Sequence, residues 1–143
     1  MRKDNTIEAF FALVRAGLWE TDVQLASYGE VDYAEVMRLA QEQTVVGLVA
    51  AGLEHVTDVK VPQVWALQFA GQTIQLEQRN KAMNQFIAGL ISKMRESDIY
   101  SLLIKGQGIA QCYERPLWRS AGDIDLFLSD NNYSKALQLL TPI

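Results

Sequence analysis

The chain has 143 residues, of which 49% are hydrophobic and 21% are charged, and its formal net charge at pH 7 is −4. This length and composition predict one domain with its own hydrophobic core, and no stretch of 18 apolar residues is present to cross a membrane. The acidic charge disfavours broad binding to nucleic acid, and the single cysteine, Cys112, excludes an internal disulfide and is typical of a reducing cytoplasm.

The first two thirds of the chain shows the three-to-four-residue apolar spacing of amphipathic helices. The segments Asn5–Glu8 and Asp32–Glu35 are capping-box patterns, so each predicts the start of a helix. A short helix is expected over Val45–Leu53. A long helix is expected over Pro62–Glu96, because proline suits the first turn of a helix.

One apolar stripe follows the predicted long helix. Asn80 interrupts this stripe on one face of the helix. The stripe comprises Trp65, Phe69, Thr73, Leu76, Met83, Phe86, Ile87, Leu90, Ile91 and Met94.

The periodicity changes after residue 97. Strands are predicted over Tyr100–Ile104, which reads as buried, and over Ile124–Leu128. Helices are predicted over Gly106–Tyr113 and Asn131–Leu140, and a polar loop over Glu114–Gly122. The order strand, helix, strand, helix indicates an α/β unit.

The predicted fold class is therefore α+β and mostly helical. A helical bundle over residues 1–97 precedes a partial β-α-β-α unit over residues 98–143. Two strands make a poor sheet by themselves. We expect the sheet to be completed by another molecule, such as a second copy in a homodimer, or by the continuation of a longer protein of which this chain is the front part.

Two carboxylates, Asp123 and Asp125, are separated by one residue at the start of the second predicted strand. On extended backbone they would share a face, about 6–7 Å apart, and would repel unless a cation lay between them. Mg²⁺ suits such oxygen ligands and bridges carboxylates to phosphates, although two solvated carboxylates at a strand edge are the simpler interpretation. Aspartyl phosphatases and sugar-nucleotide transferases are disfavoured, because there we expect the aspartates at the carboxyl end of the strand.

The segment Lys105–Gly108 places glycines between the first predicted strand and the next helix. Such a turn lets the backbone approach a ligand and offers free N–H groups to phosphate. It is neither a dinucleotide fingerprint, which needs glycine in place of Gln111, nor a P-loop, which needs Gly-Lys-Ser/Thr. The alternative is a turn that requires glycine for its own geometry and a surface lysine at Lys105.

Two arginines precede the aspartates. Arg115 and Arg119 could bind phosphate bidentately, or could balance the charges of Glu114 and the aspartates. His55, at a predicted helix end, is interpreted as structural. Cys112 has apolar and aromatic neighbours and is interpreted as a buried thiol.

The segment LLIKGQGIAQCYERPLWRSAGDIDLFLSDNNYSKALQLL resembles the uncharacterised nucleotidyltransferase family of the DNA polymerase beta-like superfamily. Its matching features are Lys-Gly, a short helix that ends in Tyr, a Pro, an Arg and Gly-Asp-Ile-Asp-Leu. The resemblance extends more weakly upstream to about residue 32. It implies Asp123 and Asp125 as catalytic carboxylates and as ligands of two Mg²⁺ ions. It also implies a nucleoside triphosphate bound by Lys105, Gly106, Gln107 and Arg119.

The resemblance implies nucleotidyl transfer, in which an acceptor hydroxyl attacks the α-phosphorus and pyrophosphate leaves. The acceptor is unknown, and the acidic charge makes nucleic acid the least favoured one. In the superfamily that this segment resembles, a third carboxylate on a later strand joins the pair and activates the attacking hydroxyl. No such carboxylate is available here, because Asp130 lies too near in sequence to come from a separate neighbouring strand, and a hydroxyl contact is lost where the superfamily's Gly-Ser turn is Gly106-Gln107. We expect a cytoplasmic nucleotidyltransferase homologue that is not catalytically competent by itself.

A second hypothesis is a non-catalytic interaction or regulatory protein that retains this motif and binds a partner through its helical region, residues 5–96. A large exposed apolar patch on the long helix, or a dimer that completes the sheet, would favour it.

Overall fold

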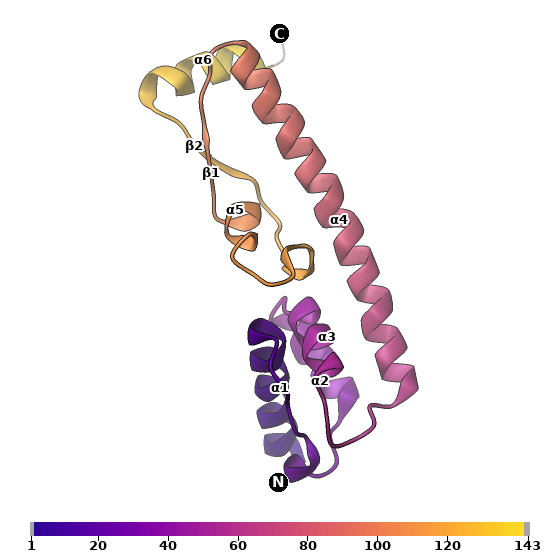
Figure 1. Ribbon diagram of the computed structural model, residues 1–143. Helices are drawn as coiled ribbons and strands as arrows, with labels where there is room; N and C mark the ends of the chain where they lie inside the picture. Colours follow the sequence, from indigo (N-terminus) through magenta and orange to yellow (C-terminus); the bar gives the residue numbers. More distant parts are fainter. Residues whose placement is uncertain (1, 142–143) are drawn as a thin grey trace.

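The computed structural model describes residues 2–141, and its fold is mostly helical α+β, as predicted (Figure 1). Helices α1 (Arg2–Trp19), α2 (Tyr33–Glu42) and α3 (Val46–Glu54) cluster at one end, with the short turn η1 (Ala26–Tyr28) between α1 and α2. Helix α4 (Gln63–Glu96) packs on this cluster with its first half and extends beyond it with its second half (Figure 1).

The two predicted capping boxes have different outcomes. The Asp32 carboxylate accepts hydrogen bonds from the backbone N–H groups of Ala34 and Glu35, at 3.1 and 3.2 Å, so it caps α2 as predicted. The prediction for Asn5 is wrong, because α1 begins at Arg2 and already includes Asn5. Turn-like polar residues also occur inside helices, so the pattern alone does not fix a helix start.

The buried face of α4 differs from the predicted stripe at two positions. Phe86 is 62% exposed, whereas Asn80 is only 1% exposed and belongs to the buried face. Buried positions on α4 recur at steps of three, four or seven residues: Phe69, Thr73, Leu76, Asn80, Ile87 and Met94. Phe69 joins the core of the α1–α3 cluster, and Met94 joins a second, smaller core with Ile99 and Ala136.

Because α4 contributes to both cores, the division of the chain at residue 97 stays a prediction. No helix in the described part of the chain combines the length and apolarity needed to span a bilayer.

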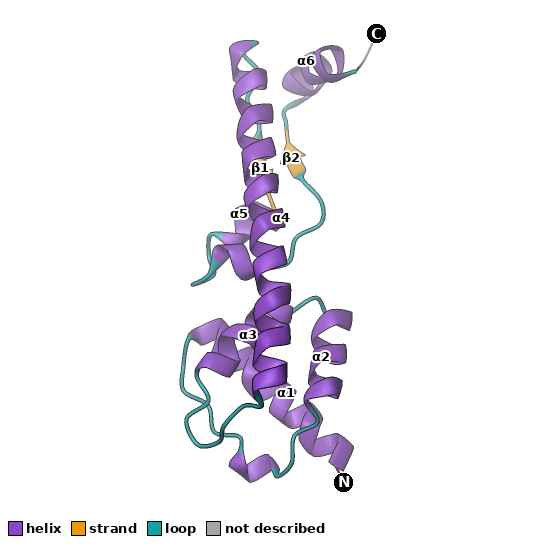
Figure 2. Ribbon diagram, turned by 90° about the vertical axis from the view of Figure 1, so that its right-hand side faces the viewer, coloured by secondary structure: helices purple, strands orange, loops and turns teal. Residues whose placement is uncertain are grey.

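The part of the chain after α4 forms a two-stranded sheet beside that helix (Figure 2). Strands β1 (Leu102–Ile104) and β2 (Asp125–Phe127) are antiparallel, and the turns between them are α5 (Gly106–Ala110) and η2 (Pro116–Trp118). Helix α6 (Asp130–Leu140) follows β2.

The prediction of a buried first strand is wrong. Leu102 pairs with Phe127 across the sheet, and their exposed fractions are 62% and 63%. Within residues 2–141 the sheet has only two strands, so this apolar pair keeps one open face. An apolar run fixes the tendency to form a strand, but the neighbours decide whether the strand is covered.

Candidate functional site

The glycine turn and the aspartates meet at one end of the sheet. The strand pairing ends at Ile104 and Asp125, and Gly106 and Asp123 each lie two residues beyond this last pair. The two backbones are in close contact, because a Cβ atom on Gly106 would lie 3.0 Å from the Asp123 carbonyl oxygen. The fold therefore brings together the two motifs that the sequence separates by a helix and a loop.

The backbone of this turn is unusual at two consecutive residues. Lys105 has φ 53° and ψ −156°, and Gly106 has φ 33°. Glycine adopts positive φ without cost, whereas a lysine there is strained and is held in place by its surroundings. The Lys105 side chain is exposed and makes no hydrogen bond or ion pair with another residue of the described chain. Its ammonium group is therefore available to an anion at the turn.

The carboxylate oxygens of the two aspartates are free to bind a ligand. Asp123 is exposed and Asp125 is half-buried, and neither carboxylate bonds to any other residue within positions 2–141. Carboxylate oxygens fit a hard cation such as Mg²⁺. No group of three or more potential metal ligands forms among the described residues, so a cation here would also need oxygens from a bound ligand.

Arg119 lies against the same turn. Its Nη1 donates to the carbonyl oxygens of Gly106 and Ser120, at 3.2 and 3.3 Å, and its guanidinium carbon lies 5.6 Å from the centre of the Tyr113 ring. Its Nε is buried and has no hydrogen-bond partner among the described residues. The arginine thus ties the loop before the aspartates to the turn, with its charge next to Gly106.

Gln107 turns its side chain away from the open side of the turn. The side chain is 4% exposed, and its Nε2 donates to Asn80 Oδ1 at 2.9 Å and contacts Met83 Sδ at 3.3 Å, both on α4. Only the backbone of Gln107 is therefore free to meet a ligand at the turn. The side chain instead anchors the turn to the long helix.

Asn80 is the residue of this region that the sequence analysis missed. Its Nδ2 donates to the carbonyl oxygens of Leu117 and Arg119, at 2.7 and 2.9 Å. The signal was present in the sequence, since Asn80 is seven residues from both Thr73 and Ile87, on the face that turned out to be buried. A polar residue at such a position predicts a specific hydrogen-bond partner.

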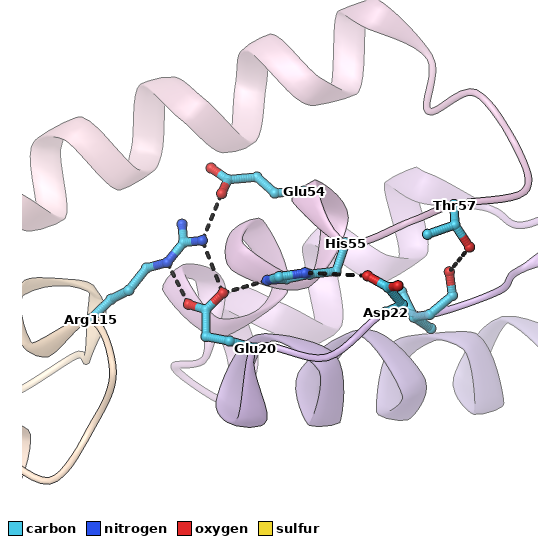
Figure 3. A network of polar contacts seen from close by, with 7 residues as sticks. Glu20, Asp22, Glu54, His55, Thr57 and Arg115 are labelled. Carbon is cyan, nitrogen blue, oxygen red and sulfur yellow. Dashed lines mark hydrogen bonds and ion pairs between the residues drawn. The ribbon is translucent and has the colours of Figure 1, made fainter.

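Arg115 has a structural role. Of the two alternatives that the sequence left open, charge balance applies, but its partners are Glu20 and Glu54 and not Glu114 or the aspartates. Its Nε donates to Glu20 Oε1 at 2.5 Å, and its Nη2 lies 2.7 Å from Glu54 Oε2 (Figure 3). The Arg115 hydrogen bond holds the pKa of Glu20 below its usual value, and the Glu54 carboxylate raises the pKa of Arg115. These contacts fasten the loop to the ends of α1 and α3.

His55 belongs to the same network, as expected of a structural histidine. It ends α3, its Nε2 contacts Glu20, and its Nδ1 lies 3.9 Å from Asp22 Oδ1 (Figure 3). The prediction of a buried Cys112 is wrong, because α5 ends at Ala110 and leaves the thiol exposed in the following turn.

Trp118, in the loop between α5 and Asp123, contacts both α4 and the α1–α3 cluster. Its Nε1 donates to Glu77 Oε1 on α4 at 2.8 Å, and the Arg115 guanidinium lies 4.4 Å above the centre of its ring. The ring also packs against the core of the α1–α3 cluster. The loop that leads into Asp123 is therefore held by side chains of α3 and α4 and by Glu20, which directly follows α1.

A family model described as "Uncharacterised nucleotidyltransferase" matches residues 29–142 of the chain. The matched segment contains α2 to α6, the glycine turn, Arg119 and both aspartates, whereas Glu20 and Asp22 precede it. No curated protein and no solved structure matches the chain.

Proposed function

Since the chain belongs to the uncharacterised nucleotidyltransferase family, we propose that it binds a nucleoside triphosphate for transfer of the nucleoside monophosphate to a hydroxyl acceptor. The observation that carries this proposal is the close contact between Gly106 and Asp123. It sets a strained backbone turn, suited to phosphate, beside carboxylates suited to a cation.

Each residue has a separate role in this proposal. Lys105 and Arg119 attract the triphosphate, and the backbone of Gly106 and Gln107 approaches it closely. Asp123 and Asp125 would hold Mg²⁺ together with phosphate oxygens, and the ion would offset the negative charge that develops on the leaving group.

The transfer itself forms a bond between the acceptor oxygen and the α-phosphorus. It breaks the bond from that phosphorus to the oxygen of the departing pyrophosphate. The acceptor hydroxyl must also give up its proton to a base. Because no third carboxylate joins the pair within the described residues, we assign nucleotide binding, rather than activation of the acceptor, to this part of the site.

The acceptor is proposed only as a hydroxyl compound, and the net charge of −4 makes nucleic acid the least favoured class. We propose the cytoplasm as the location, since one cysteine without an internal partner is typical of reducing compartments.

A second candidate function is binding of a protein partner through α4. Three apolar side chains near the start of this helix, Val64, Leu67 and Ile74, are 61%, 63% and 56% exposed, at spacings of three and seven residues. Such a row along one helix is typical of an interaction surface. This function does not require nucleotide, so the following experiment separates the two candidates.

Calorimetric titration of MgATP, and then of the other three nucleotides, tests the proposed function. We expect binding that requires Mg²⁺ and is abolished in Asp123→Asn/Asp125→Asn. The matched control is Asp130→Asn, which removes an exposed carboxylate from the nearby start of α6 and is expected to bind as the wild type does. Equal binding by the double variant, or no binding by the folded wild type, would overturn the proposal.

A further inference from the structure

Asn80 lies in the middle of α4 and is 1% exposed, yet the three hydrogen bonds of its side chain within the described residues all reach residues far along the chain. Its amide has a single possible orientation here, because only the NH₂ group can donate to two carbonyl oxygens. Nδ2 binds Leu117 and Arg119 on the loop, and Oδ1 accepts from Gln107 on the turn.

These bonds form a closed circuit around the glycine turn. Asn80 Nδ2 donates to the Arg119 carbonyl oxygen at 2.9 Å, and Arg119 Nη1 donates to the Gly106 carbonyl oxygen at 3.2 Å. Gln107, which follows Gly106 in the chain, donates back to Asn80 at 2.9 Å. One side chain of α4 therefore sets the distance between the turn and the loop that carries Arg119.

We propose that Asn80 is a positioning residue of the nucleotide site. It acts through Gln107 and Arg119 and does not itself touch the nucleotide. The inference rests on the proposed function, and it makes the long helix part of the binding site. Buried amides that satisfy several partners specify one arrangement of the segments they join, because any other arrangement leaves polar groups unpaired.

Thr73 provides a matched control on the same helix face. It is 3% exposed, and its Oγ1 donates to the Phe69 carbonyl of its own helix at 2.7 Å. Thr73→Val removes a buried polar group that has no hydrogen bond to the site. Asn80→Leu removes a buried polar group of similar size that is hydrogen-bonded to the turn and the loop of the site.

The test measures MgATP affinity by calorimetry in these two variants, in Arg119→Ala and in Asn80→Leu/Arg119→Ala. We expect Asn80→Leu to weaken binding at least tenfold and Thr73→Val to stay within twofold of the wild type. In the Arg119→Ala background, the loss caused by Asn80→Leu should be smaller than in the wild type, because the guanidinium that Asn80 helps to position is absent and only the link through Gln107 remains. If the role of Asn80 were purely structural, Asn80→Leu would lower the melting temperature and leave the MgATP affinity of the folded protein unchanged.

Hydrogen exchange of the same variants measures directly how firmly the turn and the loop are held. Asn80→Leu should speed amide exchange at residues 106–108 and 119–122 and leave exchange in α1–α3 unchanged. If Asn80→Leu does not fold, Gln107→Leu breaks the link to the turn alone and should weaken binding while speeding exchange at residues 106–108. Wild-type affinity in a folded Asn80→Leu or Gln107→Leu protein would overturn this inference alone, whereas absence of binding by the wild type would overturn the proposed function and this inference together.

Discussion

Gly106 faces the Asp123 carbonyl so closely that a Cβ atom at position 106 would lie 3.0 Å from that oxygen. The contact follows from the antiparallel pairing of Ile104 with Asp125. It locks the start of α5 to the segment before β2, so the geometry of the proposed phosphate site depends on a residue without a side chain.

Gly106→Ala should lower the free energy of unfolding by about 1–3 kcal/mol, because alanine at φ 33° is strained and its Cβ would press on Asp123. It should also weaken nucleotide binding, which calorimetry measures beside a urea unfolding curve. Gly122→Ala is the control, since a Cβ there meets nothing within 4 Å. Equal effects of the two substitutions would contradict the assigned contact.

Gly47→Ala should destabilise the protein by more than about 2 kcal/mol, because a Cβ atom at position 47 would lie 1.8 Å from the Trp118 carbonyl oxygen. The clash would push the η2 turn off α3. Gly71→Ala, on α4, meets nothing within 4 Å and should stabilise the protein by up to about 1 kcal/mol through helix propensity. Thermal unfolding of both variants checks the prediction, and a tolerated Gly47→Ala would disprove the close approach.

The Glu20 ion pair should make stability depend on pH in the acid range. The pKa of Glu20 is lowered in the folded protein, first by the hydrogen bond from Arg115. Its contribution is therefore fully present above the ordinary glutamate pKa of 4.5 and is lost as the pH falls through the lowered folded-state pKa.

Glu20→Gln should lower stability by about 1 kcal/mol at pH 7, the order expected for a partly exposed ion pair, and by less near pH 3. Unfolding curves at both pH values measure this difference. Asp58, whose pKa is also lowered by backbone hydrogen bonds from Leu25 and Ala26, is unchanged in the variant and cancels in the comparison. A difference of the same size at both pH values would exclude the pairing.

Cys112 should react with Ellman's reagent in the native protein, because its thiol is exposed. We expect one thiol per chain to titrate without denaturant, and none in Cys112→Ser. A reaction that begins only after denaturant is added would show that the turn after α5 buries the thiol.

Local features of the chain were predictable because they depend on near neighbours in the sequence. The Asp32 cap, the extent of α4 and the order of strands and helices after residue 97 all follow from caps and periodicity over a few residues. The Lys-Gly turn and the paired aspartates were also visible as residue types in a suitable order. Their residue types supplied the hypothesis of phosphate and metal binding.

Only the tertiary structure decided which of these residues meet. The close contact of Gly106 with Asp123, the Arg115 bonds to Glu20 and Glu54, and the three bonds of Asn80 join segments far apart in the chain. Burial of Asn80 and exposure of Phe86, which both lie on α4, likewise depend on what packs against each side of the helix. Such contacts are set by how chain reversals stack the elements, and no local pattern encodes that stacking.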